Sequence, residues 1–98
     1  GLPKEFILDA STLGIKKEED VLKNIKVYPN PVKNKITINS LSNFSEIELF
    51  NINGRKIINH QFKKQNNFNF YTHNLNTGIY FLSIKIDGKK FIKKIIKL

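Results

Sequence analysis

The chain has 98 residues, a formal net charge of +9 and no Cys, Met or Trp. This length supports one domain with a modest core, and the lack of Cys excludes disulfides, thiolate nucleophiles and Cys-based metal sites. No apolar run approaches the roughly 18 residues of a membrane-spanning helix, so we expect neither a transmembrane helix nor a signal peptide. The charge does not indicate nucleic-acid binding, because base readers depend on Arg and a single Arg stands among the spread lysines.

The first 25 residues differ in pattern from the rest of the chain. Residues 1–9 contain a short apolar run, Phe6–Leu8, which suggests the tail of a preceding domain or a remnant of an expression vector. Residues 10–25 carry a turn and a charged run and are predicted to form a linker. Within it, we expect Asp20 to cap a single helical turn through Val21 and Leu22.

From residue 26 onward the apolar residues alternate with a period of two, which is typical of strands. Asn53-Gly54 and Asp87-Gly88 both predict tight hairpin turns, and the second suits a type I′ turn. Short strands with turn signals every 8–12 residues predict an all-β, immunoglobulin-like antiparallel β-sandwich over residues 26–98. The seven expected strands are Ile25–Tyr28, Lys35–Asn39, Ser45–Ile52, Arg55–Phe62, Phe68–Thr72, Ile79–Ile86 and Lys89–Leu98.

Seven residues are expected to have structural roles: Tyr28, Pro29, Asn30, Pro31, Gly54, Gly78 and Tyr80. In Tyr28-Pro29-Asn30-Pro31 the prolines end a strand and stiffen a turn, and Asn30 would bond nearby backbone. Direct contact of this segment with a partner is the alternative. Gly54 and Gly78 are expected to supply positive φ angles. Tyr80 is expected in the core with its hydroxyl near the surface.

The last ten residues alternate apolar pairs with lysines: Lys89, Lys90, Phe91, Ile92, Lys93, Lys94, Ile95, Ile96, Lys97 and Leu98. One hypothesis is that the lysines protect an exposed edge strand from pairing with other chains. The other is that this terminal strand is recognised, by adding to the sheet edge of a partner with an acidic groove. A free edge strand would also allow an edge-to-edge dimer.

Catalytic, metal and cofactor sites are not expected. His60 and His73 lack neighbours at metal-ligand spacing, and the sequence contains no phosphate-binding loop and suggests no catalytic triad. An alternative function is a carbohydrate-binding or other accessory module of a secreted enzyme. Its aromatic platform would have to come from Phe62, Phe68, Phe70 and Tyr71, although Phe-rich faces usually form cores.

Four motifs occur in an order and spacing that resemble a known family. They are Val27–Val32, Ile47–Ile57, Leu75–Leu82 and the lysine-rich terminal strand. Together they resemble the C-terminal sorting domain of the type IX (Por) secretion system of Bacteroidota, of the type A-like kind. The resemblance covers about residues 25–98, and the final Leu98 departs from the more usual polar ending.

The resemblance implies a non-enzymatic signal domain at the C-terminus of an exported cargo protein. Such a domain would be recognised by the outer-membrane type IX translocon and removed by a sortase-like peptidase, here between about residues 10 and 25. The cargo would pass through the periplasm and reach the outer-membrane surface or the medium. The resemblance also favours recognition over edge protection for the residues from Lys89 to Leu98.

Overall fold

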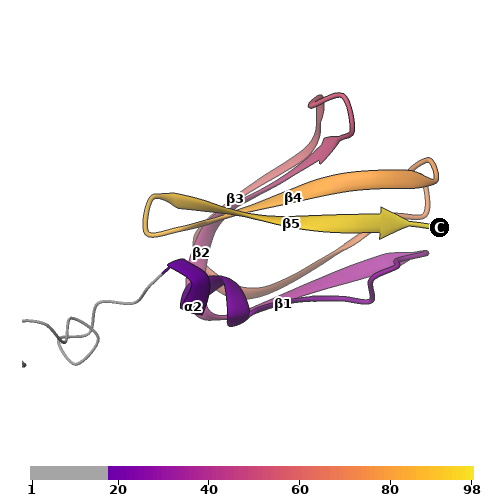
Figure 1. The fold of residues 1–98 in the computed structure, drawn as a ribbon. Helices are drawn as coiled ribbons and strands as arrows, with labels where there is room; N and C mark the ends of the chain where they lie inside the picture. The colour runs from indigo at the N-terminus through magenta and orange to yellow at the C-terminus, as the bar shows by residue number, and fades with distance from the viewer. Residues whose placement is uncertain (1–17) are drawn as a thin grey trace, which may run out of the picture.

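The computed structural model describes residues 18–98, so the expected tail at 1–9 and most of the expected linker at 10–25 lie outside the described residues. The described part contains one short helix, α2 (Glu18–Lys23), and five strands. The strands are β1 (Ile25–Tyr28), β2 (Lys35–Asn51), β3 (Lys56–Tyr71), β4 (Gly78–Ile86) and β5 (Lys89–Lys97), as Figure 1 shows.

The prediction of an all-β antiparallel domain is confirmed, but the prediction of seven strands is wrong. Residues 18–98 contain five strands, because two pairs of expected strands are continuous. No Pro or Gly interrupts residues 40–44, so β2 runs through them, and β3 likewise continues through Lys63–Asn67, which was expected to be a polar loop. Shifts in the β2–β3 register between Asn39 and Glu46 mark where the paired strands bend.

The bend in β2 and β3 curls the sheet over a single core. β3 pairs along β2 on one side, whereas the other side of β2 pairs first with β1 and then with β4. β5 pairs with β4 and completes the order β1-β2-β4-β5. As a result β1 lies below β4 and β5 in Figure 1, and the inward faces of these strands meet.

The core consists of residues at alternate positions of the strands, as period-two patterning requires. The fully buried side chains include Ile36 and Ile38 from the first half of β2, and Ile47 and Leu49 from its second half. The remaining buried apolar residues are Ile25, Val32, Phe44, Phe70, Tyr80, Leu82, Ile84, Ile86, Phe91 and Ile95.

Helix α2 lies inside the segment predicted to be a linker. Val21 and Leu22 lie in this helix, and both side chains pack against the core. Asp20 is a residue of the helix itself, because the helix begins at Glu18, and its carbonyl accepts a hydrogen bond from the Asn24 N–H at 3.2 Å. The predicted helical turn is therefore confirmed, and the predicted cap is wrong.

Two of the turns depend on positive φ angles. Asp87 and Gly88 have φ angles of 51° and 81°, as the predicted type I′ turn requires. At the β2–β3 turn only Gly54 is positive, at 81°, and its N–H donates to the Asn51 carbonyl at 2.9 Å. The predicted hairpin therefore forms around Asn51–Gly54. Gly78, at the start of β4, has a φ of 152°.

The segment after β1 joins the sheet to the outer edge of β5. The Asn30 side-chain amide donates to the Lys94 carbonyl at 2.9 Å, and its Oδ1 accepts the Ile96 N–H at 3.0 Å. Val32 adds two backbone bonds, donating to the Ile96 carbonyl at 2.8 Å and accepting the Leu98 N–H at 2.9 Å. The expectation that Asn30 bonds nearby backbone is therefore wrong, since its partners lie 64 and 66 residues away.

Replacing Asn30 should loosen this closure. The variant Asn30→Ala loses both amide bonds and should lower the free energy of unfolding by about 1 kcal/mol, because the freed backbone groups can bond water at this exposed edge. Urea unfolding followed by circular dichroism measures this change.

The matched control is Asn69→Ala, on an exposed position of β3 where residues 18–98 show no side-chain hydrogen bond for the amide. This control should change stability by less than about 0.5 kcal/mol. Equal effects of the two substitutions would contradict the assigned role of Asn30.

Candidate recognition surface

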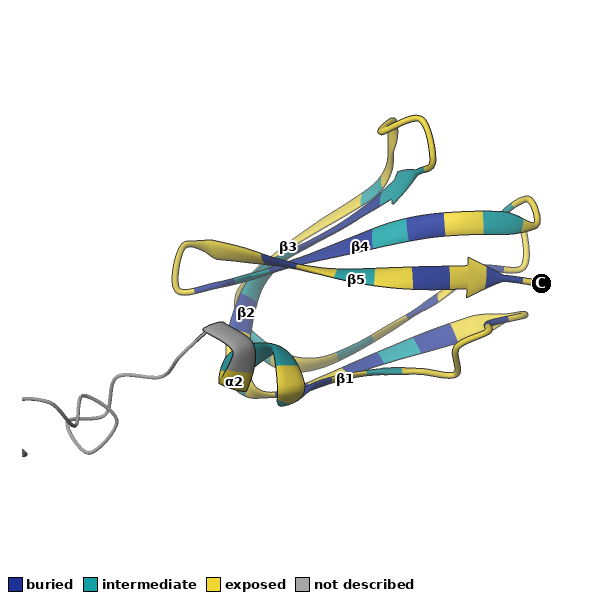
Figure 2. Cartoon of the chain, viewed as in Figure 1, coloured by how far each residue is buried: buried dark blue, intermediate teal, exposed yellow. Residues whose placement is uncertain are grey.

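The predicted recognition strand β5 presents two different faces. Phe91 and Ile95 point into the core, with 8% and 2% of their surface exposed. Ile92, Ile96 and Leu98 point outward and are 51%, 39% and 53% exposed. Figure 2 shows this alternation along β5. The paired apolar residues of the sequence are therefore divided between the core and the surface.

The five lysines of this strand do not form one patch. Lys93 and Lys97 share the inward face, where Lys93 is half-buried and the Lys97 ammonium donates to the Leu98 carbonyl at 2.7 Å. Lys90 and Lys94 lie on the outward face and are exposed. Lys89 is exposed beside the β4–β5 turn.

The outer edge of β5 is covered over its C-terminal half. The bonds from Asn30 and Val32 engage the backbone of Lys94, Ile96 and Leu98. Within residues 18–98, no loop residue makes a hydrogen bond to the backbone groups of Ile92 on this edge of the strand. A partner strand that added along the last five residues would therefore have to displace the Asn30–Val32 segment.

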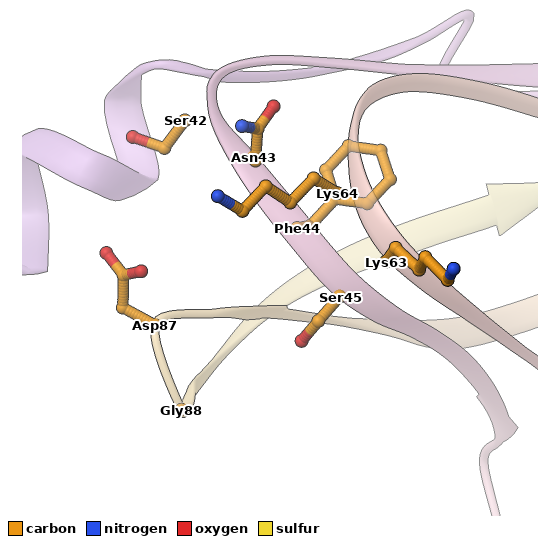
Figure 3. A pocket seen from close by; sticks show the side chains of 8 residues that line it. All are labelled: Ser42, Asn43, Phe44, Ser45, Lys63, Lys64, Asp87 and Gly88. Carbon is orange, nitrogen blue, oxygen red and sulfur yellow. The ribbon is translucent and has the colours of Figure 1, made fainter.

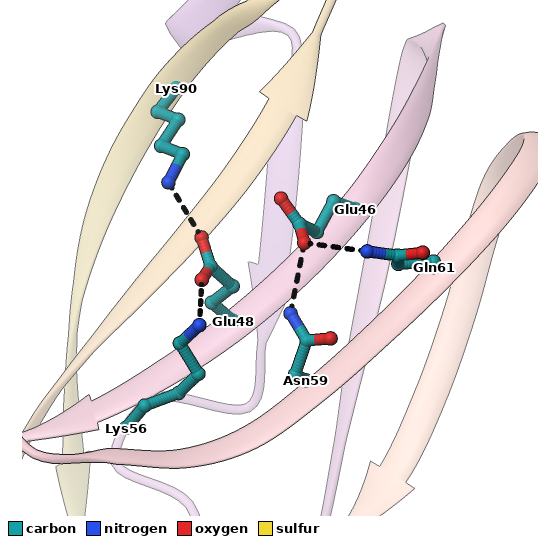
Figure 4. A network of polar contacts seen from close by, with 6 residues as sticks. All are labelled: Glu46, Glu48, Lys56, Asn59, Gln61 and Lys90. Carbon is teal, nitrogen blue, oxygen red and sulfur yellow. Dashed lines mark hydrogen bonds and ion pairs between the residues drawn. The ribbon is translucent and has the colours of Figure 1, made fainter.

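A buried carboxylate connects β5 to the rest of the sheet. Glu48 on β2 is 3% exposed and accepts contacts from the ammonium groups of Lys56 at 2.9 Å and Lys90 at 3.0 Å (Figure 4). Hydrogen bonds from these two lysines hold the pKa of the Glu48 carboxyl below its ordinary value, although burial opposes the shift. Lys90 is thus engaged within the domain. The alternation in Ile47-Glu48-Leu49 puts Glu48 on the face opposite the two apolar residues, but this alternation does not by itself show that Glu48 is buried.

A second carboxylate, Glu46, lies two residues earlier on the same face. Its Oε2 accepts hydrogen bonds from the Asn59 amide at 3.0 Å and the Gln61 amide at 3.3 Å, both from β3 (Figure 4). These bonds lower the pKa of Glu46. The two glutamates therefore tie β2 to β3 on one side and, across β4, to β5 on the other.

The other candidate residues differ in how far they are buried. Tyr28 is 49% exposed, and Pro29 and Pro31 flank Asn30 on the surface. Tyr80 is 6% exposed, and its hydroxyl donates to the Asn76 carbonyl at 2.7 Å.

Three of the four aromatic residues considered for a binding platform pack inward instead. Phe70 is buried, and Phe62 and Phe68 pack against the core with ring centroids 4.8 Å apart. Tyr71 lies on the opposite face of β3 and is exposed. These residues do not form one flat exposed surface.

An open hollow of about 330 Å³ lies where the β2 and β3 bends meet the β4–β5 turn (Figure 3). Its walls supply two lysines and one carboxylate but no histidine. Among the described residues no group of three His, Asp or Glu could hold a metal ion. The residues that line the hollow are Ser42, Asn43, Phe44, Ser45, Lys63, Lys64, Asp87 and Gly88.

Over residues 26–98 the sequence matches the family model of the secretion system C-terminal sorting domain, the Por secretion tail. The chain belongs to this family. The match makes residues 26–98 a type IX C-terminal sorting domain, the signal of a secreted protein. No curated protein matches the chain. In the part of the sorting domain that the structure describes, no helix is long and apolar enough to cross a membrane.

The Glu48 contacts predict how the stability of the sorting domain depends on pH. Because the folded-state pKa of Glu48 lies below the ordinary 4.5, its contribution is complete above that value and is lost as pH falls through the lower folded-state pKa. The variant Glu48→Gln should therefore cost about 1–3 kcal/mol at pH 7, and less at strongly acidic pH.

Urea unfolding at neutral and acidic pH measures this difference. Asp87→Asn is the control, because Asp87 is an exposed carboxylate of the β4–β5 turn and Asn also tolerates the positive φ angle of this position. A cost of Glu48→Gln that stays constant down to the acid limit would contradict the assignment.

Proposed function

We propose that this domain is a non-enzymatic address label that carries an N-terminal cargo protein across the outer membrane through the type IX translocon. A sortase-like peptidase then removes the label, and the cargo stays on the cell surface or enters the medium. On this proposal the source is a bacterium of the Bacteroidota, and the domain needs no cofactor.

The observation that carries the proposal is the family match, which runs from the start of β1 to the final Leu98. It includes the whole curled sheet and not an isolated peptide. Two features agree with a signal at the C-terminus. β5 is an ordered strand rather than a frayed end, and one of its faces is open to a partner.

We assign the recognition signal to the residues from Lys89 to Leu98. Their outward side chains are accessible, whereas the inward ones belong to the core. Tyr28, Pro29, Asn30, Pro31, Gly54, Gly78 and Tyr80 would then act by keeping this strand in place. Cleavage is assigned to residues 10–25, ahead of the first strand.

The decisive experiment places a signal peptide and a fluorescent reporter before residues 1–98. The fusion is expressed in a host with a working type IX system and in an otherwise identical translocon mutant. We expect the first host alone to export the reporter from its cells, with the sorting domain removed by cleavage within residues 10–25. Folded reporter that stays in the periplasm of both hosts would overturn the proposal.

Within the same fusion, Lys94→Glu should lower export severalfold, because Lys94 is exposed and a reversed charge would repel an acidic partner. Lys93 is less suitable, since its side chain is half-buried. The control is Lys35→Glu, an exposed lysine at the start of β2. Normal export of the Lys94 variant would contradict a role of Lys94 in recognition and would indicate that it only protects the strand edge.

A further inference from the structure

The outward face of the β2-β4-β5 sheet carries apolar side chains that the core does not use. We call them the outer stripe. Ile79, Ile92, Ile96 and Leu98 are 37%, 51%, 39% and 53% exposed, and two Phe side chains are half-buried beside them. The members of the outer stripe are Phe50, Ile79, Phe81, Ile92, Ile96 and Leu98.

The strand register places these residues next to one another. Phe81 of β4 lies opposite Phe50 of β2. On its other side, β4 pairs Ile79 with Ile96 of β5. Ile92 is opposite Ser83, two steps from the Ile79–Ile96 pair on the same face, and the Phe81–Lys94 pair lies between them. Diagonal neighbours on a sheet are within reach of an aromatic side chain, so Phe81 connects Ile92 and Ile96 and makes the outer stripe continuous over three strands.

Single exposed apolar residues need no explanation, but a continuous patch with a polar border usually marks a binding surface. Three lysines lie on this face: Lys94 is opposite Phe81, and Lys85 and Lys90 are opposite each other beyond Ile92. Carboxylates offset two of them, because Lys90 is ion-paired with Glu48 and Lys85 lies opposite Glu46. Lys94, between Ile92 and Ile96, has no carboxylate partner among residues 18–98 and is the remaining cation of the outer stripe.

We infer that the outer stripe is the face by which the sorting domain is recognised. Its partner would be a protein with an apolar surface and a carboxylate that meets Lys94. This inference rests on the proposed function and places the partner in the outer-membrane translocon. It also extends the signal beyond the terminal ten residues, because Phe50, Ile79 and Phe81 come from β2 and β4.

Charge decides between this occupant and two others. A second copy of the chain would bring a second net charge of +9 to the interface, and this like charge disfavours self-association. An anionic lipid surface would be attracted by the lysines but would meet the Glu46 carboxylate on the same face. A protein surface can place apolar groups opposite the outer stripe and a carboxylate opposite Lys94, and it can avoid Glu46.

The test uses the reporter fusion with the full chain. Ile79→Thr and Ile92→Thr remove outer-stripe methyl groups while keeping β-branched side chains that suit strands. Each should lower export by about tenfold, as expected for central residues of an interface. Leu41→Thr and Tyr71→Thr are matched controls, because both residues are exposed and lie outside the outer stripe. These controls should leave export unchanged.

Each outcome distinguishes the inference from the proposed function. Failure of the wild-type fusion to leave the cell would overturn the proposed function itself. Wild-type export with equally good export of the Ile79 and Ile92 variants would overturn only the inference. Thermal unfolding of the purified chains must give wild-type midpoints for all four variants; a lowered midpoint for an outer-stripe variant would attribute its export defect to folding and count against the inference.

Two binding measurements on the purified chain test the other occupants. The first is sedimentation with vesicles of phosphatidylcholine and phosphatidylglycerol, and the second is analytical ultracentrifugation of the chain alone. We expect neither vesicle binding nor a dimer through the outer stripe. Vesicle binding or a dimer that Ile92→Thr abolishes would overturn the assignment to a protein partner.

Discussion

The structure depends on the contact between the Asn30–Val32 segment and β5. The strand order leaves β1 at one end of the curled sheet and β5 at the other, so these strands would expose unpaired edges. Four hydrogen bonds from Asn30 and Val32 connect the two ends. They add to the pairing with β4 that places Phe91 and Ile95 of β5 in the core.

The curl itself comes from the bend in β2 and β3. Phe44 lies at the bend and is 1% exposed, so its burial fixes the point at which the sheet turns. The Phe62 ring packs edge-to-face against it, with centroids 5.6 Å apart, and Phe68 then contacts Phe62. The aromatic residues that could have formed a binding platform therefore hold the two halves of the sheet together.

Period-two patterning predicted the positions and faces of most strand residues because it depends only on local geometry. It placed Tyr80, Leu82, Ile84 and Ile86 on one face, and all four are buried. The patterning did not show that two pairs of strands are continuous, because polar residues such as Lys63 and Lys64 also occur in extended edge segments. Residues 40–44 and 63–67 contain neither Pro nor Gly, but they do contain Ser and Asn, which are common in turns, so the residue types did not separate the two cases.

Long-range contacts were beyond local patterning for a different reason. The partners of Asn30 are set by the curl of the sheet and not by sequence neighbours. The burial of Glu48 likewise depends on lysines from β3 and β5 that meet only in the folded domain. The two faces of β5 were ambiguous from sequence because its apolar residues come in pairs.

On the proposed function, the division of β5 into two faces would link folding to recognition. Phe91 and Ile95 hold the strand in the core, while Ile92 and Ile96 complete a surface begun by β4. An unfolded or detached terminal peptide would carry the outward residues of β5 but not Ile79 or Phe81 beside them. A partner that contacts three strands at once would therefore bind the folded domain in preference to the peptide. A signal of this kind would report that the label has folded before its cargo is exported.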